Sequence, residues 1–288
     1  MWSIYFFWHK DIFREHKEEK VMAKIGFIGM GNMGYAMLNG ALKVFDKDDL
    51  VFTDVNSDRM KTVSEETGVR YVESNAELAN SAKFIVLAIK PQFYGAVVKN
   101  IENIVKKDNI IISIAPGISV SSLKDALGFD ARIVRAMPNT PALLGEGMTG
   151  VCYDQTALTF EEKDIVGKLF NSFGKYKLVD ERLMSAVTCV SGSSPAYVYM
   201  FIEALADGAV KHGMPRDAAY EMAAQTVAGA AKMVLETKQH PGALKDAVCS
   251  PGGTTIAGVA ALEEYGFRSS IIKAVDACYD VAEGFNKR

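Results

Sequence analysis

Short runs of β-branched and aliphatic residues alternate with segments of helical periodicity from residue 23 to about residue 181, and this alternation constrains the fold most. Because parallel strands need a crossover between them, usually a helix, the alternation predicts a parallel sheet with helices on both faces. The strands are expected at residues 23–28, 50–55, 70–73, 84–89, 109–115 and 132–137. Helices are expected at residues 32–44, 58–67, 92–106 and 119–127.

The pattern changes after residue 181. Two last strand-like runs, GMTGVCY and KYKLVDE, flank a helix opened by Thr159, and Glu162 three residues later completes a capping box. We therefore predict an α/β domain over residues 22–181 and an all-helical domain over residues 182–288. The helices of the second domain are expected at residues 182–190, 194–212, 215–237, 242–249, 254–265 and 268–285.

Residues 1–21 differ from both domains. They contain a short aromatic run and then a dense charged stretch, without the basic start or the small-residue cleavage site of a secretory signal. A second methionine, Met22, stands directly before AKIGFIGMG. We therefore expect residues 1–21 to be an extension outside the fold and the native protein to begin at Met22.

Charge and cysteine usage exclude several function classes. The net charge of −3 comes from 32 basic and 35 acidic residues without a long run of either sign, which argues against a nucleic-acid surface. Apolar runs such as FIVLAI are far too short to cross a membrane. Cysteines 152, 189, 249 and 278 form no CxxC pair, which favours reduced thiols in the cytoplasm and predicts no metal site.

The first glycine-rich loop, GFIGMGNMG, has the spacing G-x-G-x-x-G directly after the first strand and at the start of the first helix. In that context the glycines permit a tight turn, close approach of a pyrophosphate, and close helix–strand packing, while the helix N-terminus offers N–H groups to phosphates. The loop predicts dinucleotide binding; the alternative is a purely structural turn. The residues assigned to the cofactor here are Gly29, Gly31, Asn32, Met33 and Gly34.

Near the end of the second strand stands a candidate residue for distinguishing NADH from NADPH. Asp54, 20 residues after Gly34, stands where an acidic side chain ordinarily holds the ribose 2′-hydroxyl of NAD. A solvated loop acid or a helix cap is the alternative role. Arg59 lies near enough to serve a 2′-phosphate, so the sequence leaves both cofactors open.

The helical domain lacks the proton donor that ketone reduction requires. An alkoxide develops in that reaction, and His or Lys usually protonates it. The stretch RLMSAVTCVSGSSPAYVYM contains neither residue, and we expect His212 to lie at a helix C-terminus and His240 in a turn. Reduction of a cyclic imine is less demanding, because hydride addition to the protonated imine neutralises an existing charge. The site then needs orientation and an anchor for a carboxylate.

A second glycine-rich loop, SPGGTT, supplies that anchor. Consecutive backbone N–H groups of Gly252, Gly253 and Thr254 at a helix N-terminus would form an anion pocket. Ser250 and Thr255 add hydroxyls on either side. The alternative is a glycine turn in which Thr254 or Thr255 only caps the helix.

The run PGALKDAVCSPGGTTIAGVAALE resembles a motif of the Δ1-pyrroline-5-carboxylate reductases, which carry out the last step of proline synthesis. GFIGMGNMG, LAIKPQ, RAMPNTPALLGEGMT and SGSSPAYVYMFIEAL are also similar to blocks of that family, so the resemblance runs from Met22 to the C-terminus. It implies a Rossmann-type dinucleotide-binding domain followed by an all-α dimerisation domain. The implied reaction is hydride transfer from NADPH or NADH to the C=N bond of the substrate, giving L-proline.

The resemblance also implies roles for single residues. Thr255 would hydrogen-bond the ring nitrogen and is the nearest thing to a catalytic group, while Ser250 and the amides of Gly253, Thr254 and Thr255 would hold the substrate carboxylate. The residues that the family would place along the cofactor are Asn75, Ala88, Ile89, Lys90, Pro91, Ile114, Ala115, Met137, Pro138 and Asn139. Pro116, Ala247, Lys238 and Asp54 depart from the family pattern. Asp54 stands where NADP-preferring members often carry an uncharged residue, which implies good use of NADH.

Members of this family pair their helical domains into an intertwined dimer that often assembles into a ring of five dimers, so a homodimer and possible decamer are implied here. Two other functions remain as alternatives: a 3-hydroxyacid dehydrogenase on the same architecture, and a non-catalytic dinucleotide sensor. The first needs a Lys or His opposite the nicotinamide, and the second has no need of a carboxylate pocket.

Overall fold

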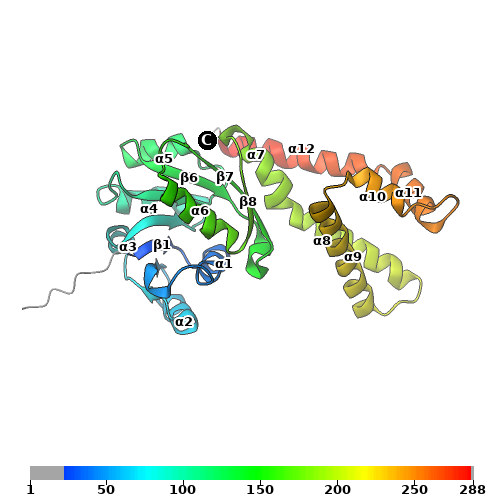
Figure 1. The fold of residues 1–288 in the computed structure, drawn as a ribbon, viewed down its shortest axis with the longest axis horizontal. Coiled ribbons are helices and arrows are strands. Elements are labelled where there is room, and N and C mark those ends of the chain that lie inside the picture. Colours follow the sequence, from blue (N-terminus) through cyan, green and yellow to red (C-terminus); the bar gives the residue numbers. More distant parts are fainter. Residues whose placement is uncertain (1–22, 287–288) are drawn as a thin grey trace, which may run out of the picture.

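A single eight-stranded sheet organises the first part of the molecule (Figure 1). The computed structural model describes residues 23–286, so the predictions for residues 1–21 and for a start at Met22 lie outside the described residues. The strand order is β3-β2-β1-β4-β5-β6-β7-β8. The strands are β1 (Ala23–Ile28), β2 (Leu50–Thr53), β3 (Arg70–Tyr71), β4 (Ala82–Leu87), β5 (Ile110–Ser113), β6 (Arg132–Met137), β7 (Gly147–Tyr153) and β8 (Gly174–Leu178).

The sheet is parallel from β3 to β6, as predicted, but β7 runs antiparallel to β6. The alternation predicted parallel strands up to β6 and made no prediction for the direction of β7. Strand β7 is antiparallel because the connection from β6 contains only the 3-10 turn η3 (Thr140–Leu144) and is too short for a crossover. Strand β8 returns to the direction of β7 because helix α6 (Phe160–Asn171) crosses between them.

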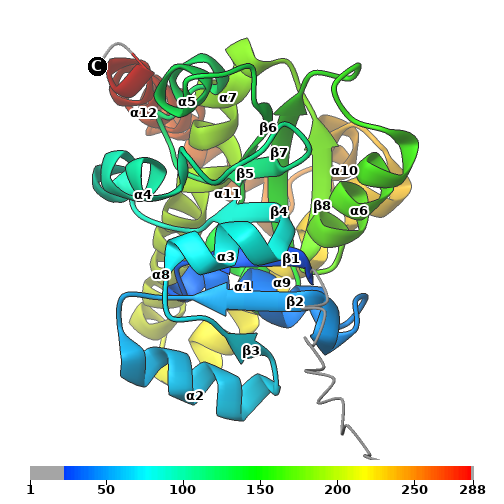
Figure 2. The same ribbon diagram turned by 90° about the vertical axis from the view of Figure 1, so that its left-hand side faces the viewer.

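Helices cover both faces of the sheet because alternate strand residues point to opposite sides. Ile25 and Phe27 of β1 belong to one buried cluster, which helices α1 (Asn32–Ala41), α2 (Ser57–Thr67) and α6 help to form. Ile28 belongs to the other cluster. The helices on that second face are α3 (Asn75–Ser81), α4 (Tyr94–Ile101) and α5 (Val120–Leu127) (Figure 2).

Two of these helices differ from the sequence prediction. No helix was expected over α3, although Ser74 and Glu77 have capping-box spacing, and the Ser74 hydroxyl indeed accepts the Glu77 N–H at 3.1 Å. The helix expected at 92–106 is shorter: a 3-10 turn, η2 (Pro91–Phe93), precedes α4, which ends at Ile101. The chain has to turn back there because β5 starts at Ile110.

The second part of the described chain is helical and projects from the sheet (Figure 1). The 3-10 turn η4 (Glu181–Leu183) and α7 (Met184–Val187) lead through a π-helical segment, η5 (Thr188–Ser193), into α8. Helix α12 returns along the others to the sheet, where Glu283 accepts a hydrogen bond from the Ser185 hydroxyl at 2.6 Å. The remaining helices are α8 (Ser194–Lys211), α9 (Arg216–Thr237), α10 (Pro241–Ala247), α11 (Thr254–Glu264) and α12 (Phe267–Asn286).

This helical part has almost no core of its own. From α8 onward, the buried hydrophobic side chains among the described residues are four alanines: Ala206, Ala219, Ala223 and Ala282. Large apolar side chains are exposed instead, including Tyr199, Met200, Met222, Met233, Leu235 and Ile272. Extended apolar surface of this kind marks a protein interface. No helix within residues 23–286 is both long enough and apolar enough to cross a membrane.

Candidate functional site

A cleft of about 360 Å³ opens at the carboxyl ends of the parallel strands. Strand β1 lies between β2 and β4, so the chain direction along the sheet reverses there, and ligands of open α/β sheets bind at such a switch point. Four loops, which follow β1, β4, β5 and β6, supply the lining. The lining residues are Gly31, Asn32, Met33, Ala88, Ile89, Lys90, Pro91, Ile114, Ala115, Pro116 and Pro138.

The glycine loop has the geometry that a dinucleotide requires. Gly29 adopts a φ of +99°, and a Cβ on Gly34 would lie 2.1 Å from the Gly29 carbonyl oxygen. By contrast, no atom lies within 4 Å of the place where a Cβ on Gly31 would be, so the backbone is open to a ligand. Gly31 caps α1 without a side chain, leaving the first N–H groups of the helix for phosphate oxygens. The residues present therefore fit a dinucleotide.

The buried hydroxyl of Tyr94 shapes two of the cleft loops. It donates to the Leu87 carbonyl at 2.9 Å and lies 3.0 Å from the Ser113 hydroxyl, so it joins the ends of β4 and β5. Burial raises the pKa of Tyr94 to about 12, which keeps the hydroxyl protonated. Sequence reasoning missed this residue, since a tyrosine three positions after Pro91 carries no motif.

Six predicted cofactor residues are not among the lining residues of the cleft: Gly29, Gly34, Asp54, Asn75, Met137 and Asn139. Asp54 accepts hydrogen bonds from the backbone N–H groups of Met30 and Asn56, and Asn75 is the half-buried first residue of α3. The alternative that Asp54 caps α2 does not hold, because Asn56 occupies that position and accepts the Arg59 N–H.

Asn139 and Met137 join the cleft to the helical part. Asn139 is 8% exposed; its Nδ2 donates to the Ser191 carbonyl at 2.9 Å, and its Oδ1 accepts the Met148 N–H at 2.8 Å. Met137 lies so close to Gly192 that a Cβ there would be 2.8 Å from its Cε. The end of β6 is thereby fixed against η5, which a sequence pattern does not reveal.

The SPGGTT loop forms a tight turn before α11. Gly252 adopts a φ of +68°, and the Gly253 N–H donates to the Ser250 carbonyl at 3.0 Å. The Gly253 amide, which was expected to hold a carboxylate, is therefore engaged in the turn. Gly253 caps α11 without a side-chain hydrogen bond, so neither threonine acts as the cap. Within the described part of the chain, the N–H groups of Thr254 and Thr255 have no backbone acceptor.

The two loops do not meet within one chain. Figure 1 shows α10 and α11 at the end of the molecule away from the sheet, and Thr255 does not line the cleft. His212 is the C-cap of α8, as expected, whereas His240, which was expected in a turn, caps α10 by accepting the Gly242 N–H. Among the described residues, no cluster of three His, Cys, Asp or Glu side chains could hold a metal, and the four cysteines are free.

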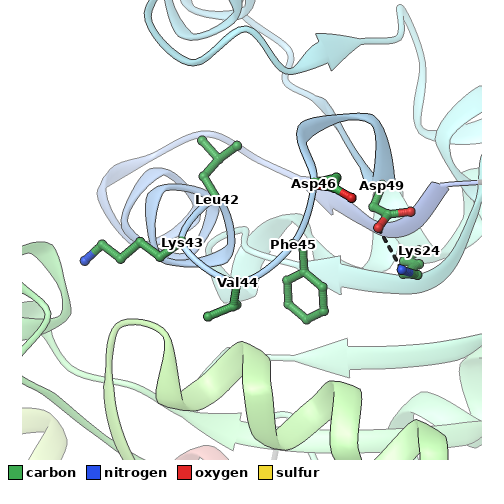
Figure 3. Close-up of a pocket in the computed structure, with 7 residues that line it drawn as sticks. All are labelled: Lys24, Leu42, Lys43, Val44, Phe45, Asp46 and Asp49. Atoms are coloured by element: carbon green, nitrogen blue, oxygen red, sulfur yellow. Dashed lines mark hydrogen bonds and ion pairs between the residues drawn. The ribbon is translucent and has the colours of Figure 1, made fainter.

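A second cavity, of about 370 Å³, lies at the opposite edge of the sheet (Figure 3). Lys24 and Asp49, at the amino-terminal ends of β1 and β2, form an ion pair of 2.8 Å on one side of it. Its other lining residues are Leu42, Lys43, Val44, Phe45 and Asp46. This cavity is remote from the glycine loop and contributes none of the predicted site residues.

Comparison with known proteins identifies the family. Residues 181–285 match the model described as pyrroline-5-carboxylate reductase dimerisation, and residues 24–117 match that of NADP oxidoreductase, coenzyme F420-dependent. The pyrroline-5-carboxylate reductase of Escherichia coli (strain K12) is 46% identical over 267 residues, covering 92% of this chain and 98% of that protein. The chain belongs to the pyrroline-5-carboxylate reductase family. The resemblance read from the motifs is confirmed.

Other members of the family extend the comparison. The enzyme of Methanosarcina acetivorans is 42% identical over 88% of this chain and 94% of its own length. The Plasmodium falciparum pyrroline carboxylate reductase, solved with NADP bound, superposes with a TM-score of 0.82 at 34% identity, covering 92% of this chain and 98% of that one. The Coxiella burnetii pyrroline-5-carboxylate reductase gives a TM-score of 0.86 at 32% identity, covering 93% and 100%. The predicted two-part architecture is confirmed.

Proposed function

We propose that this protein reduces the C=N bond of Δ1-pyrroline-5-carboxylate with NADH or NADPH and so forms L-proline. The observation that carries the proposal is the SPGGTT turn, whose helix N-terminus presents free N–H groups beside the hydroxyls of Ser250 and Thr255. A carboxylate and an imine nitrogen are the groups that such a turn would bind. The close family relationship supports the same substrate.

In the cofactor half of the site, the first N–H groups of α1 would hold the pyrophosphate. Lys90 and Pro91 on one side and Ile114 and Ala115 on the other would enclose the rest of the cofactor along the cleft. When bound there, the reduced nicotinamide supplies the hydride. Tyr94 and Asn139 fix the loops that would surround the bound cofactor.

In the substrate half of the site, the N–H groups of Thr254 and Thr255 and the Ser250 hydroxyl would bind the carboxylate. The Thr255 hydroxyl would hydrogen-bond the ring nitrogen and orient the C=N carbon toward the cofactor. No side chain has to deliver a proton, because a protonated imine becomes the neutral amine when it accepts hydride. The first turns of α8, which carry no Lys or His, fit this chemistry and not a hydroxyacid dehydrogenase.

A complete site requires two chains. The SPGGTT turn lies away from the cleft of its own chain, and the helices around it expose apolar side chains that one chain leaves uncovered. We propose a homodimer in which the turn of one chain faces the cleft of the other, with five dimers forming a decamer. We also propose the cytoplasm as its compartment, in line with four free cysteines.

Two measurements test this proposal. Oxidation of NADH and NADPH should be followed with pyrroline-5-carboxylate, and absence of turnover with both cofactors would contradict the reaction and favour a sensor. The shared site is tested with Gly31→Val, which blocks the cofactor, and Thr255→Ala, which weakens the substrate half. In co-expressed mixed assemblies about one quarter of the sites would combine an intact cleft with an intact turn. A mixture no more active than its two components would place each site within one chain.

A further inference from the structure

Two oppositely charged side chains near the end of β2, Asp54 and Arg59, form hydrogen bonds with the backbone of the same glycine-loop residue, Met30. The Asp54 Oδ2 accepts the Met30 N–H at 2.6 Å, and the Arg59 Nε donates to the Met30 carbonyl at 3.0 Å. In dinucleotide-binding sheets the adenosine ribose lies at this strand end, where its 2′ substituent is read. The two side chains therefore compete for the role of distinguishing NADH from NADPH.

Asp54 has a structural task that occupies both of its oxygens. While Oδ2 holds the Met30 N–H, Oδ1 accepts the Asn56 N–H at 2.9 Å, so the carboxylate clamps the glycine loop to the turn between β2 and α2. Hydrogen bonds from two N–H dipoles also stabilise and partly offset its negative charge. The carboxylate is directed at the protein backbone.

Contacts on one side hold the Arg59 guanidinium in place and leave its two Nη groups accessible. Its guanidinium lies 4.6 Å from the centre of the Tyr35 ring, and the Tyr35 hydroxyl donates to Glu66 at 2.8 Å. Nε donates to the Met30 carbonyl. The two Nη groups form no hydrogen bond or ion pair with another described residue, so they are available to a ligand. A planar guanidinium held in this way presents a fork that matches phosphate oxygens.

We infer that Arg59 binds the 2′-phosphate of NADPH and sets the cofactor preference, while Asp54 is a clamp of the glycine loop. The inference rests on the proposed dinucleotide-dependent function and names the residue that selects the cofactor. Val55, whose side chain is fully exposed beside Asp54, adds an apolar surface at the same strand end for the adenine. The selected cofactor is NADPH.

Calorimetric binding of 2′,5′-ADP and 5′-AMP to the full-length protein tests the inference without turnover, since the two probes differ only in the 2′-phosphate. Arg59→Gln should weaken 2′,5′-ADP about 10- to 100-fold relative to 5′-AMP, the range for losing hydrogen bonds to a charged group. Lys61→Gln is the matched control, because this exposed lysine on α2 lies two positions away and faces elsewhere. It should leave the ratio of the two affinities unchanged.

Asp54→Asn separates the two roles. A clamp predicts a lower unfolding midpoint and weaker binding of both probes together. A gain of about tenfold or more in 2′,5′-ADP affinity alone would make Asp54 the discriminator and overturn the inference. Equal losses of both probes in Arg59→Gln, or no loss, would do the same. Failure of the protein to reduce pyrroline-5-carboxylate would refute the proposed reaction and leave these binding results unaffected.

Discussion

The two glycine-rich loops look alike in the sequence but differ in almost every physical respect. The loop around Gly31 is built into the sheet, and its neighbours leave no room for a side chain on Gly34. The turn around Gly252 is exposed, and no atom lies within 4 Å of the position that a Cβ would take there. Both loops contain a glycine with positive φ, Gly29 and Gly252, but only the first loop also needs a glycine, Gly34, for close packing against the backbone.

This difference shows which half of the site one chain completes. The first loop needs only its own strand and helix, so the cofactor cleft is formed within the chain. The second loop presents unsatisfied N–H groups of a helix that lies away from that cleft. In the shared site that we propose, the cleft of a second chain completes this half.

The largest effect is expected for Gly34→Ala. The added Cβ would lie 2.1 Å from the Gly29 carbonyl oxygen, and a backbone atom cannot rotate away. We expect a loss of about 3 kcal/mol in the free energy of unfolding and loss of cofactor binding. Urea unfolding and cofactor titration measure both. A variant with wild-type stability would show that the first loop is not tightly packed.

Thr255→Ala should have an intermediate effect and should change catalysis more than stability. In the proposed mechanism the Thr255 hydroxyl orients the imine nitrogen, so its removal should lower kcat/KM about 10- to 100-fold, equivalent to about 1–3 kcal/mol. The side chain is exposed, so the unfolding midpoint should stay close to that of the wild type. Thr255→Ser, which keeps the hydroxyl, is the matched control and should recover most of the activity. Unchanged kinetics in Thr255→Ala would mean that another group holds the ring nitrogen.

The smallest effect is expected for Gly252→Ala. The added methyl group meets no atom in one chain, so the penalty is the φ of +68°, which amounts to about 1–2 kcal/mol for a residue with a Cβ. Gly95→Ala is the control, because Gly95 lies in α4 with equal space but ordinary helical geometry. It should stabilise the fold by about 0.5–1 kcal/mol. A loss from Gly252→Ala as large as that from Gly34→Ala would remove the contrast between the loops.

Local patterns predicted most of the secondary structure. All eight strand-like runs form strands, and the Thr159–Glu162 capping box closes on both sides as its spacing indicated. Helix α3 was missed because it has only seven residues, and its capping signal at Ser74 is weak without a long periodic segment behind it. The direction of β7 was not predicted, because strand direction depends on the length of a connection and not on the strand itself.

For the candidate site, the glycine motif and the family resemblance implied which residues belong to it, but not how they are arranged. The cleft gathers Gly31, Lys90, Pro91, Ile114 and other expected residues in one place. The hydrogen-bond partners could not be foreseen, because they join residues far apart along the chain. Asn139 reaches Ser191, and the Tyr94 hydroxyl joins Leu87 to Ser113.

By itself, the sequence determined the cofactor class, the α/β-then-helical order and the family, because glycine spacing, strand–helix alternation and the SPGGTT run are local in the chain. Tertiary structure decided what those residues face. It turned the Asp54 carboxylate toward the backbone, left the two Nη groups of Arg59 accessible, and placed the turn that carries Thr255 away from the cleft of its own chain. The orientation of a side chain and the distance between two loops depend on packing between distant segments, which no local pattern encodes.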